Sequence, residues 1–215
     1  MLTGPIFAPL SGAIRKIVVF LHGYGSNGAN LIDIAEIWSK QLPDTLFIAP
    51  NAPYPCDISA LGYQWFGLPD LNPFNVRQGL DSIAPTIRSY ITKLATDHKL
   101  TPKDIALVGF SQGAILSFEM LFQIPGLGGI IDYSGAFYAP TSTEPPKDAP
   151  PVLLVHGTAD TVVPYAAMLH AQAQLSLYDV TVETHTCAGM GHSIDDAGLR
   201  VGINYLKKVL FQKAS

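Results

Sequence analysis

Short apolar runs bounded by Gly, Pro or Asp recur along this chain and limit its fold more than any other feature. Their length and their content of Val, Ile and Leu predict β-strands. Most of the runs are continuously apolar rather than alternating, which is typical of parallel strands covered by helices on both faces. We therefore expect a buried, mostly parallel sheet, with strands at residues 15–21, 45–49, 105–109, 129–133, 152–156 and 180–186.

Segments with helical three-and-four spacing of apolar residues lie between these runs. They predict helices at 31–38, after Pro85 through residue 94, from Gln112 to before Pro125, from Pro164, and from about Ser193 to residue 210. Strands that alternate with helices favour right-handed crossovers and an α/β fold. At 215 residues, we expect one domain over 1–215.

The segment 50–78 does not follow this pattern. It combines several prolines with the aromatic residues Tyr54, Tyr63, Trp65, Phe66 and Phe74. Its length exceeds that of an ordinary connector. We expect a cap or a substrate-facing loop here.

The charge balance excludes some classes of partner. Thirteen basic against seventeen acidic residues give a formal net charge of -4, so the basic surface that DNA or RNA requires is not expected. The uncharged stretch 161–178 contains Pro164 and His170, unlike the apolar helix of about 20 residues that spans a bilayer. The first residues carry no basic segment followed by an apolar core, so we expect a cytoplasmic protein. Cys56 and Cys187 are expected to be reduced thiols.

A nucleophile elbow is predicted at Gly109-Phe110-Ser111-Gln112-Gly113. The strand before it and the helix after it supply the context in which such a serine is exposed at a sharp turn. The alternative is a plain strand-to-helix turn with a solvated serine.

A serine hydroxyl needs a base within reach and an acid that orients the base. Asp160 follows a predicted strand, and His192 lies in a glycine-rich loop before the last helix. The order Ser111, Asp160, His192 is that of the α/β-hydrolases. The alternatives are that Asp160 only caps a helix and that His192 is a surface or capping residue.

Two backbone N–H groups are candidates for an oxyanion hole. One belongs to Gln112, directly after the serine, and the other to Tyr24, in the glycine-rich loop that follows the first long strand. The alternative for Tyr24 is a tight glycine turn that only packs strand against helix.

Neither a metal nor a cofactor is expected. His185 and Cys187 lack the second pair of ligands that a zinc site needs. Residues 23–28 match Gly-x-Gly-x-x-Gly, but residues 49–51 supply no acid for a ribose.

The sequence resembles the phospholipase/carboxylesterase family of small α/β-hydrolases, which includes bacterial carboxylesterases and acyl-protein thioesterases. The likeness runs in order through Phe20-Leu21-His22-Gly23-Tyr24-Gly25, the elbow, His156-Gly157 with Asp160, and Gly191-His192-Ser193. It implies an α/β-hydrolase fold with little or no cap. It also implies a serine esterase or thioesterase with Ser111, Asp160 and His192 as its triad and a small acyl ester or thioester as its substrate.

The same resemblance places Trp65 and Phe66 near the active site, as substrate contacts or as core anchors. Residue 67 is Gly where thioesterase members often have an acid, and no Cys for palmitoylation lies near the N-terminus. Both departures favour a general carboxylesterase over an acyl-protein thioesterase. A lysophospholipase, a peptidase and a non-catalytic binding protein on the same fold are the competing hypotheses, and a homodimer remains open.

Overall fold

The computed structural model describes residues 2–70, 72–141 and 146–211. Its main feature is a seven-stranded sheet in the order β1-β3-β2-β6-β7-β8-β9, in which only the short edge strand β1 runs antiparallel to its neighbour. The strands are β1 (Ile6–Phe7), β2 (Lys16–Leu21), β3 (Thr45–Ile48), β6 (Ile105–Phe110), β7 (Gly129–Tyr133), β8 (Val152–Gly157) and β9 (Val182–Cys187).

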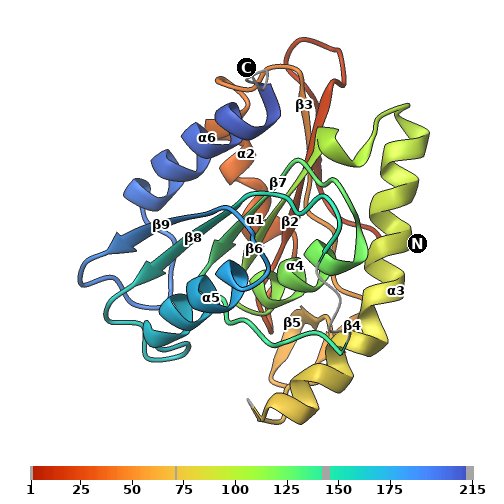
Figure 1. Ribbon diagram of the computed structural model, residues 1–215. Coiled ribbons are helices and arrows are strands. Elements are labelled where there is room, and N and C mark those ends of the chain that lie inside the picture. The colour runs from red at the N-terminus through yellow and green to blue at the C-terminus, as the bar shows by residue number, and fades with distance from the viewer. Residues whose placement is uncertain (1, 71, 142–145, 212–215) are drawn as a thin grey trace.

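Helices cover both faces of this sheet, as Figure 1 shows. One face packs against α3 (Pro73–Asp97), α4 (Gln112–Gln123) and α5 (Ala166–Ser176), and the other packs against α1 (Ala29–Ile32), α2 (Ile34–Trp38) and α6 (Asp196–Phe211). A short 3-10 helix, η1 (Pro102–Asp104), leads into β6. In the described part of the chain, no helix is both long and apolar enough to cross a membrane.

The side chains of β2 show why the strands are continuously apolar. Val18 and Phe20 belong to the apolar cluster on one face, whereas Ile17, Val19 and Leu21 belong to the cluster on the other. Successive side chains of a strand point to opposite faces, so a strand covered on both faces must be apolar at every position. The predicted buried, mostly parallel sheet is confirmed.

Helix α3 differs from the prediction because it begins well before Pro85. Asn72 caps it by accepting a hydrogen bond from the N–H of Phe74, and Pro73 occupies the first turn, where proline is tolerated. Pro85 lies inside the helix on its exposed side. The buried stripe that includes Ile83 and Ile87 continues across it, and this packing outweighs the lost backbone hydrogen bond.

The segment 50–78 forms a small hairpin and the first turns of α3 rather than a continuous loop. Its strands, β4 (Tyr54–Cys56) and β5 (Ser59–Gln64), pair antiparallel. The N–H of Gly25 donates to the carbonyl of Tyr63 (3.0 Å), and the N–H of Tyr63 donates to the carbonyl of Ser26 (2.7 Å). The hairpin is therefore fixed to the loop that follows β2. Residue 71 lies outside the described residues.

Candidate active site

The predicted site residues lie at one edge of the sheet, where the parallel strands end. Leu21 pairs with Gly109, and Gly157 pairs with Cys187, so the strands before each candidate loop end at similar heights. Loops at the carboxyl ends of parallel strands form the usual binding crevice in open α/β sheets. This register brings the loops with Ser111, Asp160 and His192 to the same edge.

Ser111 lies in a strained turn between β6 and α4. Its backbone has φ 53° and ψ −116°, a conformation that L-residues adopt at a cost of about 1–2 kcal/mol. The N–H of Ser111 donates to the carbonyl of Tyr133 at the end of β7 (3.0 Å). Ser111 itself is half-buried. The neighbouring strand therefore holds the serine in this conformation at the N-terminus of α4.

The two glycines of the elbow allow the close approach of helix and strands. A Cβ at Gly109 would overlap the backbone of Ala114, and one at Gly113 would overlap the carbonyl oxygen of Leu21. Glycine is the residue for which such backbone contact costs nothing sterically. The first turn of α4 can therefore rest directly on the end of β2.

Asp160 and His192 form a hydrogen-bonded pair. The Nδ1 atom of His192 lies 2.8 Å from Oδ2 of Asp160, and the other carboxylate oxygen accepts hydrogen bonds from the N–H groups of Val162 and Val163, each at 2.9 Å. Burial raises the pKa of Asp160, but the hydrogen bonds from His192, Val163 and Val162 outweigh it, so its pKa lies below the ordinary value. Asp160 is therefore a buried carboxylate that fixes the orientation of the imidazole.

Backbone hydrogen bonds between the loops after β8 and β9 bring this pair together. The N–H of Thr158 donates to the carbonyl of Cys187 (3.1 Å), and the N–H of Ala159 donates to the carbonyl of Met190 (3.0 Å). The imidazole of His192 then packs on the ring of Phe110, with centroids 4.8 Å apart. Since Phe110 directly precedes Ser111, the third candidate lies next to the elbow.

The loop that follows β2 lies against the elbow from the other side. A Cβ added at Gly23 would lie 3.3 Å from the Cβ atom of Ser111. His22 supports this loop: its Nε2 accepts from the N–H of Ala52 (3.0 Å), so its Nδ1 carries the proton and donates to the carbonyl of Gly23 (2.8 Å). Burial lowers the pKa of His22, more than the bond to Gly23 raises it. The His22 side chain is therefore uncharged, and its two hydrogen bonds hold the loop that carries Tyr24 in place.

The side chain of Gln112 has a role that the sequence analysis missed. Its Oε1 accepts from the N–H of Trp65 (3.0 Å), and its Nε2 donates to the carbonyl of Phe66 (2.8 Å). The indole N–H of Trp65 in turn donates to the carbonyl of His22 (2.8 Å). These bonds join the elbow, the segment after β5 and the loop after β2. The one local sign of this role in the sequence is an amide side chain directly after the serine.

Trp65 and Phe66 differ in what they can reach. Trp65 is 0% exposed and lies against the ring of His22, whereas Phe66 is 4% exposed and lines a pocket of about 320 Å³ together with Tyr54 and Gly79. A ligand in that pocket would touch Phe66 but not Trp65.

Cys56 and Cys187 are buried free thiols. Across residues 2–70, 72–141 and 146–211, no three His, Cys, Asp or Glu side chains gather as a metal site requires. The imidazole that Asp160 orients packs on the ring of Phe110, the residue before Ser111.

Comparisons with known proteins show the family of this chain. The sequence profile of the family described as Phospholipase/Carboxylesterase matches residues 8–210. The chain is 26% identical over 194 residues to Esterase YpfH of Escherichia coli, covering 90% of this chain and 82% of that protein. It is 28% identical over 212 residues to Acyl-protein thioesterase 1 of Saccharomyces cerevisiae, covering 91% and 93% of the two chains.

A solved structure shows the same fold. The crystal structure of esterase PE8 superposes with a TM-score of 0.91 at 37% identity and covers 97% of this chain and 99% of that one. The architecture is the α/β-hydrolase fold with a mostly parallel central sheet and no large cap, as expected from the resemblance. The chain therefore belongs to the phospholipase/carboxylesterase family of α/β-hydrolases.

Proposed function

We propose that this protein is a serine carboxylesterase that hydrolyses small acyl esters, and thioesters of the same size, through an acyl-enzyme on Ser111. The observation that carries the proposal is the 2.8 Å contact between His192 and Asp160, with the imidazole packed on Phe110, the residue before the strained Ser111. Membership in a family of carboxylesterases and thioesterases supports the reaction class.

In the first step His192 acts as the general base. Because its Nδ1 donates to the Asp160 carboxylate, its Nε2 carries the lone pair that accepts the proton of Ser111. The serine oxygen bonds to the ester carbonyl carbon and forms a tetrahedral intermediate. The imidazolium, stabilised by Asp160, then gives its proton to the leaving oxygen or sulfur, and the bond to that atom breaks.

In the second step water replaces the leaving group. His192 takes a proton from the water, whose oxygen attacks the acyl carbon, and it returns the proton to Ser111 as the acid leaves. Protons and bonds balance over the cycle, so no cofactor is needed.

The N–H groups of Tyr24 and Gln112 form the proposed oxyanion hole. Gln112 is the first residue of α4, where a backbone N–H has no partner within the helix. The loop of Tyr24 lies against Ser111, as the contact at Gly23 indicates. Losing one such donor typically costs a hundred- to a thousand-fold in turnover.

We propose an apolar acyl chain as the acyl part of the substrate, with Phe66 as a contact. Trp65, which has no exposed surface, then acts by positioning the loops through His22 and Gln112. A chain-length series of p-nitrophenyl esters tests this part. We expect kcat/KM to rise beyond acetate, and a flat series would remove the apolar acyl chain from the proposal.

The alternatives make different predictions about substrate. An acyl-protein thioesterase or a lysophospholipase would prefer an acylated peptide or a lysophospholipid over a short ester, and a peptidase would cleave amides. Gly67, where thioesterase members often have an acid, favours the carboxylesterase. A non-catalytic binding protein would hydrolyse none of these, so a panel of the four substrate classes separates the hypotheses.

The decisive experiment is labelling by a fluorophosphonate probe together with ester hydrolysis. We expect the probe to label the protein and the Ser111→Ala variant to lose both labelling and about a million-fold in turnover. The matched control is Ser117→Ala, which removes a buried hydroxyl from α4, the helix that begins directly after Ser111, and should keep both labelling and turnover. Unchanged hydrolysis by Ser111→Ala would refute the proposed function.

A further inference from the structure

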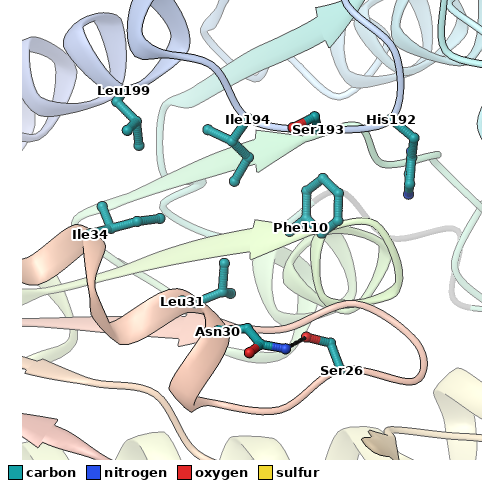
Figure 2. A pocket seen from close by; sticks show the side chains of 9 residues that line it. All are labelled: Ser26, Asn30, Leu31, Ile34, Phe110, His192, Ser193, Ile194 and Leu199. Carbon is teal, nitrogen blue, oxygen red and sulfur yellow. Dashed lines mark hydrogen bonds between the residues drawn. The ribbon is translucent and has the colours of Figure 1, made fainter. Parts of the chain in front are cut away.

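An open pocket of about 360 Å³ lies beside His192, on the side of α1, α2 and α6 (Figure 2). We call it the His192 pocket. Figure 2 shows the ring of Phe110 between the imidazole of His192 and the interior of the pocket. The other apolar side chains around it are Leu31, Ile34, Ile194 and Leu199. Its volume lies near the lower end of the range for small-ligand sites, about 300–1,000 Å³.

The chemistry of the lining selects a neutral, mainly apolar group. Of the lining residues, only His192 can carry a charge, and its role is in proton transfer. The polar groups Ser26 and Asn30 lie on the α1 side, where the Asn30 amide donates to the hydroxyl of Ser26 (2.9 Å). Because burying a phosphate or carboxylate requires a paired charge, this lining does not suit the phosphate groups of a lysophospholipid or of coenzyme A.

The position of the pocket relative to His192 identifies which part of the substrate it would hold. In the proposed reaction His192 protonates the leaving oxygen, so the carbon atoms attached to that oxygen must lie beside the imidazole. The acyl part stays bonded to Ser111, with its carbonyl oxygen at the N–H groups of Tyr24 and Gln112. Two residues that line the pocket, His192 and Phe110, lie at the edge of the sheet that carries Ser111. Phe110 is the residue directly before Ser111.

We infer that the His192 pocket binds the alcohol part of the ester and selects neutral apolar alcohols of about the size of a single ring, such as benzyl alcohol. This inference rests on the proposed function and adds a substrate class to it. Ile34, Ile194 and Leu199 then determine specificity for the leaving group, apart from the residues that contact the acyl chain.

Two esters of the same acid isolate this effect. Methyl butyrate and benzyl butyrate give the same acyl-enzyme, so their kcat/KM values differ only through binding and transfer of the alcohol part. We expect the wild-type protein to prefer the benzyl ester by about tenfold or more, since differences of this size follow from filling an apolar pocket.

Two variants of α2 provide the matched test. Ile34→Trp places a large ring in the pocket, whereas Ile37→Trp makes the same change in the same helix at an exposed position that does not line it. We expect the benzyl-to-methyl ratio of kcat/KM to fall about tenfold in Ile34→Trp and to stay within about twofold of the wild-type ratio in Ile37→Trp. Ile34→Ala should shift the preference toward a larger naphthylmethyl ester, an outcome that damage to folding would not produce.

The acyl-enzyme offers a second readout. Added benzyl alcohol should compete with water for the acyl group and form benzyl butyrate from methyl butyrate, less so in Ile34→Trp. An unchanged benzyl-to-methyl ratio in Ile34→Trp, with both esters still hydrolysed, would overturn the pocket assignment and leave the esterase intact. Absence of labelling at Ser111 and of hydrolysis of either ester would overturn the proposed function, and the pocket assignment with it.

Discussion

Asp160 and Asp132 are both buried acids near the ends of neighbouring strands, yet their pKa values move in opposite directions. Asp160 follows β8 and accepts three hydrogen bonds, from His192, Val162 and Val163, which lower its pKa against the effect of burial. Asp132 in β7 accepts one, from the N–H of Gly135 (3.0 Å), and burial raises its pKa to about 7. Its Oδ2 has no hydrogen-bond partner in the part of the chain that the structure describes.

The difference teaches that burial alone does not make an acid useful to a neighbouring histidine. A buried carboxyl group stays neutral unless enough donors stabilise its charge. Asp160 has these donors because the chain turns back on it at residues 162 and 163, whereas the side chain of Asp132 remains inside the layer between the sheet and α4. Of the two acids, Asp160 has the lowered pKa and the hydrogen bond to an imidazole.

The largest expected effect comes from removing the charge of Asp160. In Asp160→Asn, the amide nitrogen can replace Oδ2 and donate to Nδ1 of His192, which moves the imidazole proton to Nε2. The imidazole then cannot accept the Ser111 proton, and turnover should fall by about ten-thousand-fold, as in other serine hydrolases. Steady-state hydrolysis of p-nitrophenyl butyrate measures it.

The matched control for this change is Asp132→Asn, the same substitution at the acid that accepts its hydrogen bond from Gly135 rather than from a histidine. We expect its turnover to stay within about threefold of the wild type. A loss at Asp132→Asn as large as that at Asp160→Asn would show that the two acids are not functionally distinct.

The second prediction concerns the pH dependence of stability. Between the ordinary pKa of 3.8 and the raised value of about 7, the unfolded chain has released the Asp132 proton and the folded protein has kept it. The contribution of Asp132 to the free energy of unfolding is therefore full below about pH 4 and is lost as the pH rises to about 7. The loss is on the order of 4 kcal/mol, at about 1.4 kcal/mol per pH unit.

Urea denaturation of the wild type and of Asp132→Asn between pH 4 and pH 8 measures this contribution. The variant lacks the titrating group, so its stability should fall less over this range, and it should exceed that of the wild type at pH 8. Parallel pH profiles for the two proteins would contradict the raised pKa of Asp132.

The smallest expected effect is at Ser134, two residues beyond Asp132. Its backbone has φ 52°, and its buried hydroxyl has no partner within the described residues. Ser134→Gly removes the left-handed strain at a modest entropic cost and should stabilise the protein by on the order of 1 kcal/mol. Urea denaturation should show this gain. The slope of the free energy of unfolding against pH, which Asp132 causes, should stay unchanged because the substitution adds no hydrogen-bond donor for that acid. A slope that disappears in Ser134→Gly would mean that this hydroxyl controls the titration.

Local sequence was sufficient to predict much of the sheet and of the candidate site. The apolar runs identified β2, β6, β7 and β8, because strands covered on both faces must be apolar at each position. The elbow around Ser111 could be predicted because its two glycines avoid steric overlap with the neighbouring backbone. The assignment of Asp160 and His192 as partners depended on their order in the chain, and their catalytic roles stay a prediction.

Other features depend on contacts between distant segments and were not predictable. The continuation of α3 through Pro85 depends on burial of its stripe against the sheet and α4. The short edge strand β1 forms because it pairs with β3. The hydrogen bonds of Gln112 to Trp65 and Phe66 join residues far apart in the chain, and no local pattern encodes them.

The alternation of strands and helices follows from periodic burial and the strained serine turn from local sterics, so both could be predicted from the sequence, which also gives the chain order of the three candidate residues. Contacts between distant segments lower the pKa of Asp160, raise the pKa of Asp132, and form the apolar pocket beside His192. The physical reason is that protonation and pocket shape depend on the donors and side chains that distant segments bring within a few ångströms, and folding alone sets those distances.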